Sequence, residues 1–158
     1  MSTMLTRIDL RAGAAADLGT VDSIMQAAFD PRFGEAWTRN QCLGILSMPG
    51  VWLTIASIDD EPAGFALSRI IVDEVELLLL ATVPGLRRRG VGSALLRSVV
   101  AESVGRGAKS LHLEVRDGNA AIRLYAGSGF EKVGERRRYY RGSDGQAFDA
   151  FTFRLELA

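Results

Sequence analysis

The stretch Glu76–Arg97, ELLLLATVPGLRRRGVGSALLR, decides the fold. Its first part, Leu77–Val83, is almost entirely apolar and has no polar stripe at helical spacing, which predicts a strand covered on both faces. A Pro-Gly pair ends the strand, and the loop after it contains three consecutive arginines followed by Gly-Val-Gly. Because an apolar helical pattern then begins at Ser93, the stretch reads as strand, loop and helix.

The loop of this stretch has the composition of an anion site. Gly90 and Gly92 allow the backbone to approach a ligand closely, and the free N–H groups of the first helical turn point toward it. Three guanidinium groups, those of Arg87, Arg88 and Arg89, surround the same place. A phosphate group is therefore the expected ligand.

Length and composition narrow the class of protein. The 158 residues predict a single domain, residues 1–158, and the 47% hydrophobic and 24% charged fractions are those of an ordinary globular protein. Nineteen Lys and Arg balance 19 Asp and Glu, so no global basic field argues for nucleic acid. Cys42 is the single cysteine, which excludes an internal disulfide and fits a reducing cytoplasm. Charges interrupt the apolar residues of the N-terminus, so we expect neither a signal peptide nor a membrane span there.

Apolar periodicity along the rest of the chain predicts a mixed α+β sheet. Thr6–Arg11 is expected to be a first strand with Ile8 and Leu10 on one face, and Asp17 to cap the helix that follows it. A strand-helix-strand crossover makes the strand at Leu111–Arg116 parallel to the one at Leu77–Val83. The other expected elements are a short helix from Trp37, a hairpin of residues 51–56 and 63–70, a helix of residues 120–128 capped by Asn119, and a closing hairpin of residues 130–133 and 150–155.

Two familiar nucleotide motifs do not fit the arginine-glycine loop. A Rossmann fingerprint requires a third glycine where this chain has Leu95, and a P-loop requires a Gly-Lys-Ser/Thr sequence that the chain lacks. The remaining pattern, Arg87-x-x-Gly90-x-Gly92 at a strand-to-helix junction, is also compatible with a solvated basic turn.

The second half of the chain resolves this ambiguity through a resemblance. Together with the loop, the chain resembles the GNAT acetyltransferase superfamily, and within it the RimI-type ribosomal-protein alanine N-acetyltransferases, over essentially its whole length. The matching segments are Leu113-Glu114-Val115-Arg116, Asn119 to Ile122, Leu124-Tyr125, Gly129-Phe130, Asp73-Glu74, Glu35 to Thr38, Arg138-Tyr139-Tyr140, Gly145 and Asp149-Ala150.

The resemblance implies a fold, a co-substrate and a set of site residues. The fold is the GNAT fold, a mainly antiparallel mixed sheet of about seven strands flanked by about four helices and splayed between the central parallel strands. Acetyl-CoA is the implied co-substrate, and no metal is expected. Glu114 is the implied general base and Tyr125 the general acid for the departing thiolate. The implied acetyl-CoA contacts are Leu80, Ala81, Thr82, Arg87, Arg88, Arg89, Gly90, Val91, Gly92, Ser93 and Asn119.

Acetyl transfer to an amine is compatible with these residue types. A protein α-amine, with a pKa of about 7.7–8.0, loses its proton more readily than a lysine side chain near 10.4, so a carboxylate base is adequate. Each residue also has a structural reading. Glu114, on the opposite face of its strand from Leu113 and Val115, could be a solvated or salt-bridged glutamate, and Tyr125 a packing residue. His112 shares the face of Glu114 and could relay protons, but a lone histidine in a strand is more often structural. Cys42 reads as a buried thiol rather than a nucleophile.

The acceptor groove is the least defined part. The resemblance places Tyr139 and Tyr140 beside a peptide groove. Trp37 is expected either on the opposite wall of this groove or in a core or dimer contact. The run of arginines around the two tyrosines reads as a solvated hairpin rather than as an RNA contact. The interval from Asn119 to Tyr125 is one residue shorter than in the family, which weakens the assignment of Asn119, and Leu79 and Arg141 replace residues common in its groove.

The expected function is transfer of the acetyl group of acetyl-CoA directly to a protein N-terminal α-amine, with alanine of a ribosomal small-subunit protein as the leading acceptor. Acetylation of a small-molecule amine, such as a polyamine or an antibiotic, is the alternative, and a non-catalytic acyl-CoA-binding module is a third reading. The expected partners are acetyl-CoA and an N-terminal peptide, without a membrane or nucleic acid. The protein is expected to be a monomer or a weak dimer.

Overall fold

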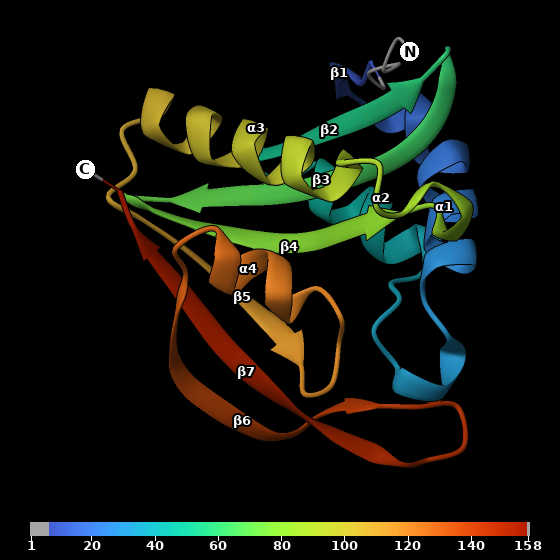
Figure 1. Cartoon of the computed structure of the whole chain (residues 1–158), viewed down its shortest axis with the longest axis vertical. Helices are drawn as coiled ribbons and strands as arrows, with labels where there is room; N and C mark the ends of the chain where they lie inside the picture. The colour runs from blue at the N-terminus through green and yellow to red at the C-terminus, as the bar shows by residue number, and fades with distance from the viewer. Residues whose placement is uncertain (1–6, 158) are drawn as a thin grey trace, which may run out of the picture.

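A computed structural model describes residues 7–157, and within them seven strands form one sheet in the order β1-β2-β3-β4-β5-β7-β6 (Figure 1). Every neighbouring pair is antiparallel except β4 and β5, which are parallel as predicted. The strands are β1 (Asp9–Gly13), β2 (Val51–Ile58), β3 (Glu61–Ile71), β4 (Glu74–Thr82), β5 (Ser110–Arg116), β6 (Glu131–Arg141) and β7 (Ala147–Glu156). The helices are α1 (Leu18–Ala28), α2 (Arg39–Leu46), α3 (Val91–Gly105) and α4 (Ile122–Gly127), with short 3-10 turns at Ala15–Asp17, Pro31–Phe33 and Pro84–Leu86.

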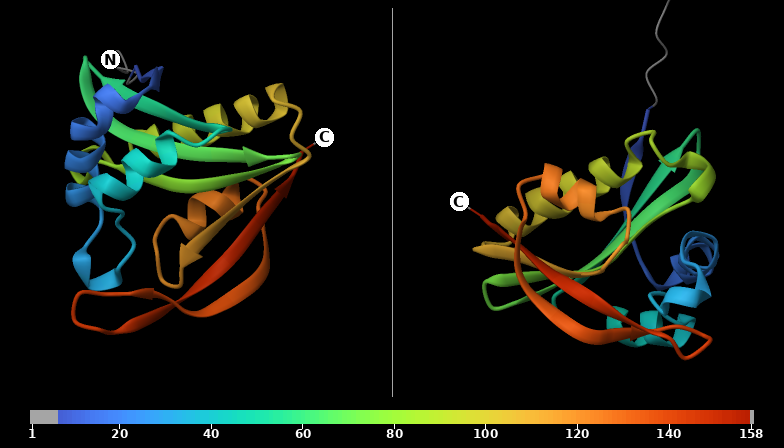
Figure 2. Two further views of the ribbon diagram at one scale, coloured as in Figure 1. Left: turned by 180° about the vertical axis from the view of Figure 1, so that it is seen from behind. Right: turned by 60° about the horizontal axis from the view of Figure 1, so that its bottom comes forward.

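Helices cover both faces of the sheet. α3 and α4 lie on the face toward the viewer in Figure 1, and α1 and α2 lie on the opposite face, which Figure 2 shows from behind. Each face has its own apolar cluster: Leu95, Val99 and Phe130 belong to the one beneath α3 and α4, while Met25 and Phe65 belong to the one beneath α1 and α2. The sheet therefore separates two packed layers.

A β-bulge in β4 exchanges the faces of that strand. Leu67 of β3 pairs with Leu79 and Ser68 pairs with Leu77, so Leu78 is an extra residue. Before the bulge, Leu77 belongs to the cluster beneath α3, and after it Leu79 belongs to the cluster beneath α1 and α2. The prediction that this strand is covered on both faces is wrong in part, because Leu78, Leu80 and Thr82 are only half-buried.

The central parallel pair comes apart soon after it forms. β4 and β5 pair only at Glu74 with Ser110, Val75 with Leu111, and Glu76 with His112. Beyond Glu76 the two strands diverge, which Figure 1 shows as a widening gap between their ribbons. β5 continues in register with β7 as far as Arg116, so the predicted splay lies between β4 and β5.

Helix starts differ from the sequence expectations by a few residues. α3 begins at Val91 rather than at Ser93. The second helix begins at Arg39, because Thr38 caps it: the Thr38 Oγ1 accepts a hydrogen bond from the Gln41 N–H at 3.1 Å, and the Thr38 N–H donates to the Gln41 side chain at 2.7 Å. Helix α4 begins at Ile122 rather than at Ala120, because the N–H groups of Ile122 and Arg123 bond to carbonyls three residues back rather than four.

Strand boundaries also differ. The first strand was predicted at Thr6–Arg11, but β1 pairs with β2 only from Asp9 to Gly13, and Leu10 is 40% exposed; Thr6 lies outside the described residues. The closing hairpin is longer than predicted, with β6 reaching Arg141. None of the helices between residues 7 and 157 is long and apolar enough to cross a bilayer.

Candidate active site

A cleft of ≈ 870 Å³ opens where β4 and β5 separate. It is lined from both faces of the sheet, by the loop before α3 and by α4 on one side, and by β6 and the segment between α1 and α2 on the other. Of the residues predicted for the site, those in the lining are Trp37, Leu80, Ala81, Thr82, Arg87, Arg88, Gly90, Val91, Gly92, Ser93, Glu114, Asn119, Tyr125, Tyr139 and Tyr140. The structure thus brings together nearly the whole predicted set.

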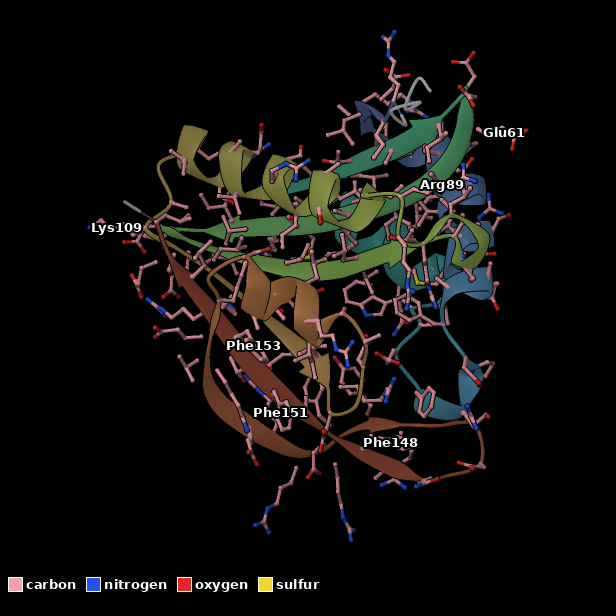
Figure 3. The ribbon with its side chains drawn as sticks, in the orientation of Figure 1. Glu61, Arg89, Lys109, Phe148, Phe151 and Phe153 are labelled. Carbon is pink, nitrogen blue, oxygen red and sulfur yellow. The ribbon has the colours of Figure 1, made fainter. Side chains whose placement is uncertain are left out.

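Arg89 is the exception. The loop turns at Arg88 (φ 67°) and at Gly90 (φ 86°), and the exposed side chain of Arg89 between them is not part of the cleft lining (Figure 3). Arg87 has a structural contact, because its guanidinium donates a hydrogen bond to the Ala28 carbonyl at 3.1 Å and connects the loop to the end of α1. Arg88 is therefore the guanidinium best placed for a ligand in the cleft.

The N-terminus of α3 has the features of an anion-binding site. Gly90 precedes the helix in the left-handed region, and no side chain caps the first turn. The first helical residues Val91, Gly92 and Ser93 line the cleft, so their N–H groups and the positive end of the helix dipole are available to an anion. At Gly92 a Cβ would lie 3.3 Å from the side chain of Leu124, so glycine here also allows α4 to pack close to α3.

The edge of β4 supplies backbone groups to the same cleft. Because pairing with β5 stops at Glu76, the part of this edge from Leu77 to Thr82 has no ladder partner on β5. The bulge at Leu78 lies within it. Unpaired N–H and C=O groups along such an edge can bind an extended polar chain, and N–H groups at a bulge can polarise a carbonyl.

Glu114 is both ion-paired and part of the cleft wall. Its Oε1 lies 3.0 Å from Nε of Arg136, and its Oε2 accepts a hydrogen bond from the Thr152 hydroxyl at 2.7 Å. Only 10% of the side chain is exposed, on the opposite face of β5 from Leu113 and Val115, as the sequence predicted. Glu114 is therefore salt-bridged, as one of its two interpretations predicts, and its carboxylate still lines the cleft.

Tyr125 reaches the cleft from the other face of the sheet. It is 6% exposed and packs edge-on against Phe130, with ring centroids 5.9 Å apart, and against Phe153 at 6.5 Å. Burial raises the pKa of the Tyr125 phenol, and the negative charge of Glu35 raises it further. The hydroxyl is consequently protonated at neutral pH and able to donate a hydrogen bond.

Glu35 holds a network to which the sequence assigned no role. Its Oε1 lies 2.9 Å from Nε of Arg116, and its Oε2 accepts a hydrogen bond from the Asn119 amide at 2.6 Å. The Glu35 and Arg116 side chains are only 9% and 11% exposed, and the Arg116 guanidinium stacks 3.7 Å above the ring of Phe33. These contacts fasten the segment between α1 and α2 to the end of β5.

Both polar atoms of the Asn119 carboxamide form hydrogen bonds within the protein. Besides its bond to Glu35, its Oδ1 accepts a hydrogen bond from the Ala121 N–H at 2.8 Å, which closes the turn before α4. The prediction that Asn119 is the N-cap of this helix is wrong, because the N-cap is Ala121 and no side chain caps the first turn. The contact of Asn119 with acetyl-CoA stays a prediction, and a ligand could reach the side chain only beside these two bonds.

The two tyrosines of β6 reach the cleft through a break in their strand. Pairing of β6 with β7 is interrupted between Arg136 and Tyr140, and Arg138 has a positive φ of 52°. The Tyr139 and Tyr140 rings meet edge to face at 4.9 Å, and the Tyr140 hydroxyl donates to the Glu114 carbonyl at 3.2 Å. They line the cleft together with Trp37, which also packs against the cluster beneath α1 and α2. Contact of these residues with an acceptor peptide stays a prediction.

Comparison with known proteins identifies the family to which the chain is similar. The chain matches the Acetyltransferase (GNAT) family over residues 20–130. It is 40% identical over 101 residues to a [ribosomal protein bS18]-alanine N-acetyltransferase of Salmonella typhimurium, an alignment that covers 63% of this chain and 68% of that protein.

Solved structures resemble this one over nearly the whole chain. The crystal structure of the ribosomal-protein-S18-alanine N-acetyltransferase from Escherichia coli has a TM-score of 0.85 and 30% identity and covers 96% of this chain and 95% of that one. Arabidopsis thaliana NAA60 in complex with acetyl-CoA has a TM-score of 0.81 at 24% identity, covers 96% and 99% of the two chains, and supports the fold alone. By its fold and by the match over residues 20–130, this chain belongs to the GNAT family of acetyltransferases, which use acetyl-CoA.

Proposed function

We propose that this protein transfers the acetyl group of acetyl-CoA directly to a protein N-terminal α-amine, and that its acceptor is the alanine N-terminus of ribosomal protein bS18. The observation that carries the proposal is a cleft that runs between two diverging strands, with Tyr125 and the α3 N-terminus on one face and Glu114 on the other. Acetyl-CoA can enter this gap from one face and place its acetyl group there, while the acceptor amine approaches from the opposite face. The named relative at 40% identity supplies the choice of acceptor.

The cofactor side of the cleft fits acetyl-CoA. The pyrophosphate would bind the uncapped N–H groups of Val91, Gly92 and Ser93, with Arg88 beside it. The unpaired edge of β4 would bind the amide groups of the pantetheine arm. Its bulge at Leu78 would then hold the thioester carbonyl near backbone donors.

The acceptor side supplies the proton chemistry. Glu114 takes a proton from the α-ammonium group, directly or through a water molecule, and the neutral nitrogen attacks the thioester carbon. As the C–N bond forms and the C–S bond breaks, the Tyr125 hydroxyl donates to the departing sulfur. The second proton that the nitrogen loses returns to the Tyr125 oxygen, so the hydroxyl is restored after each transfer. Burial raises the pKa of Tyr125, so the phenol is protonated at neutral pH before each turnover.

Direct transfer is favoured over an acetyl-cysteine route. Cys42 is buried within α2, in the cluster beneath α1 and α2, and is not part of the cleft lining. Burial also raises the pKa of the Cys42 thiol, which leaves less thiolate to act as a nucleophile.

A matched set of acceptors tests the proposal. The protein is incubated with acetyl-CoA and a bS18 N-terminal peptide, the same peptide with a blocked α-amine and a free lysine, and a polyamine, while thiol release and peptide mass are followed. We expect transfer to the free α-amine peptide only. Transfer only to the polyamine would contradict the proposed acceptor, and acetyl-CoA binding without thiol release would contradict an enzymatic role.

A further inference from the structure

A histidine-glutamate pair lies at the point where β4 and β5 separate. His112 and Glu76 form the last rung of the parallel ladder, and His112 Nε2 lies 3.4 Å from Glu76 Oε2. Glu76 lines the cleft, and 41% of its side chain is exposed, while 28% of the His112 side chain is exposed. The pair therefore extends from the cleft to the solvent at the apex of the splay.

The charged groups around His112 come from three strands. β4 contributes Glu76 and Glu74, β5 contributes Glu114 two residues away on the same face, and β7 contributes Arg154 directly opposite in register. Arg154 itself is engaged by Glu74 at 3.4 Å and by Glu156 at 2.7 Å. Tyr139 of β6 lies close enough to Glu76 and Glu114 to have the pKa of its phenol raised by them, after the larger effect of burial.

These surroundings favour the protonated imidazole. The hydrogen bond with Glu76 is the largest cause of a raised His112 pKa, burial opposes it, and the charges of Glu76, Glu74 and Glu114 add to it. The neutral imidazole is then a stronger base than an isolated one, and the neutral fraction that can accept a proton grows as the pH rises through the His112 titration.

Acetylation of an α-ammonium group leaves one proton to dispose of. The nitrogen loses two protons in becoming an amide, the departing sulfur gains one, and the other must reach the solvent. Glu114 is poorly placed to keep it, because Arg136 and Thr152 already occupy its two carboxylate oxygens. A protonated Glu114 would lose one of these contacts.

We propose that the Glu76–His112 pair carries this proton from the cleft to the solvent. The inference rests on the proposed transfer to an amine. Glu76 takes the proton that Glu114 has removed from the amine, through water in the cleft that both carboxylates line, and passes it to Nε2 of neutral His112. The imidazolium then loses a proton to bulk water. Only O–H and N–H bonds form and break. His112 is thus a positioning and relay residue that does not touch the reacting atoms.

The chain offers an unusually direct readout, because His112 is its only histidine. Its imidazole C–H resonance can be followed by NMR against pH without assignment. The same samples give kcat against pH at saturating acetyl-CoA and peptide. The variants are His112→Asn, which keeps a donor to Glu76 but cannot titrate, and Glu76→Gln. The control is Glu61→Gln, at the exposed start of β3 (Figure 3).

In the wild type, kcat should rise with pH along the NMR titration of His112. Glu76→Gln should lower the His112 pKa and move the acid limb of kcat to lower pH by the same amount, whereas Glu61→Gln should change neither. His112→Asn should remove that limb and lower kcat at neutral pH about tenfold. A wild-type limb that survives in His112→Asn, or that stays in place when Glu76→Gln shifts the NMR titration, would overturn the relay while leaving the acetyltransferase function intact. Absence of peptide acetylation by the wild type would instead overturn the proposed function.

Discussion

The two sides of the cleft are built by different means. The cofactor side is one continuous stretch of chain, from the bulge at Leu78 to the first turn of α3 at Ser93, and it presents mostly backbone groups. The acceptor side is assembled from side chains of segments far apart in the sequence. Glu35, which lies on the same segment as Trp37, contacts Arg116, which is 81 positions away.

This difference predicts how each side responds to substitution. Backbone N–H and C=O groups stay in place when a side chain is removed. Single substitutions on the cofactor side should therefore weaken acetyl-CoA binding only modestly. On the acceptor side, removal of one partner leaves a buried charge without its counterion, which is costly in stability or in rate.

The largest expected effect is on the acceptor side, at Glu114. Glu114→Gln should lower kcat about 1,000-fold at neutral pH, because the amide cannot accept the amine proton. The Kd for acetyl-CoA should stay within about twofold, since Glu114 lies on the other face of the sheet from α3. Thiol-release kinetics and calorimetry measure the two quantities. Glu131→Gln, an exposed carboxylate on β6, is the control, and unchanged turnover in Glu114→Gln would remove Glu114 as the base.

A substitution at Glu35 tests directly whether the loss of one buried partner on the acceptor side lowers the stability of the protein. Glu35→Gln should lower the free energy of unfolding by about 3 kcal/mol, because Arg116 would be left buried without its counterion. Urea denaturation measures this loss. The matched control is Glu102→Gln, which breaks the exposed Glu102–Arg106 pair and should cost no more than about 0.5 kcal/mol. Equal losses in the two variants would contradict a structural difference between the sites.

Tyr125 joins the two sides, since it packs on the cofactor face and acts on the leaving sulfur. Tyr125→Phe should lower kcat about 100-fold while keeping the ring contacts with Phe130 and Phe153 and hence the stability. Because burial raises the Tyr125 pKa, its ionisation should cause no alkaline loss of wild-type activity below about pH 10. An unchanged kcat in the variant would show that the thiolate leaves without this acid.

The smallest effect should appear on the cofactor side. Arg88→Ala should weaken acetyl-CoA binding about tenfold through the loss of one charge-assisted contact, and Arg89→Ala should change it less than about twofold, because Arg89 lies outside the cleft lining. Calorimetry with acetyl-CoA distinguishes these neighbours. Equal weakening by both substitutions would contradict the loop geometry.

The same contrast explains what the sequence could predict. Glu76–Arg97 is a local pattern in which each element is encoded by consecutive residues, so its strand, loop and helix were predicted to within a few residues. The bulge at Leu78 was not located, because four consecutive leucines carry no alternation that marks a change of face.

On the acceptor side the sequence revealed residues but not their contacts. Glu114 and Tyr140 were predicted at the site from short motifs, whereas the bonds of Glu114 to Arg136 and Thr152 depend on the pairing of β5, β7 and β6. Nothing local to Glu35 indicates that it contacts Arg116. Such pairs follow from the topology of the sheet and not from periodicity.

The central claim is that the cleft holds acetyl donor and α-amine acceptor at the same time, from opposite faces of the sheet. A bisubstrate analogue that joins coenzyme A to the α-nitrogen of an alanine-initiated bS18 peptide tests it most directly, by calorimetry against coenzyme A and the peptide alone. We predict that the analogue binds at least about 100-fold more tightly than coenzyme A, because one molecule then fills both sides. An affinity equal to that of coenzyme A alone would contradict the account.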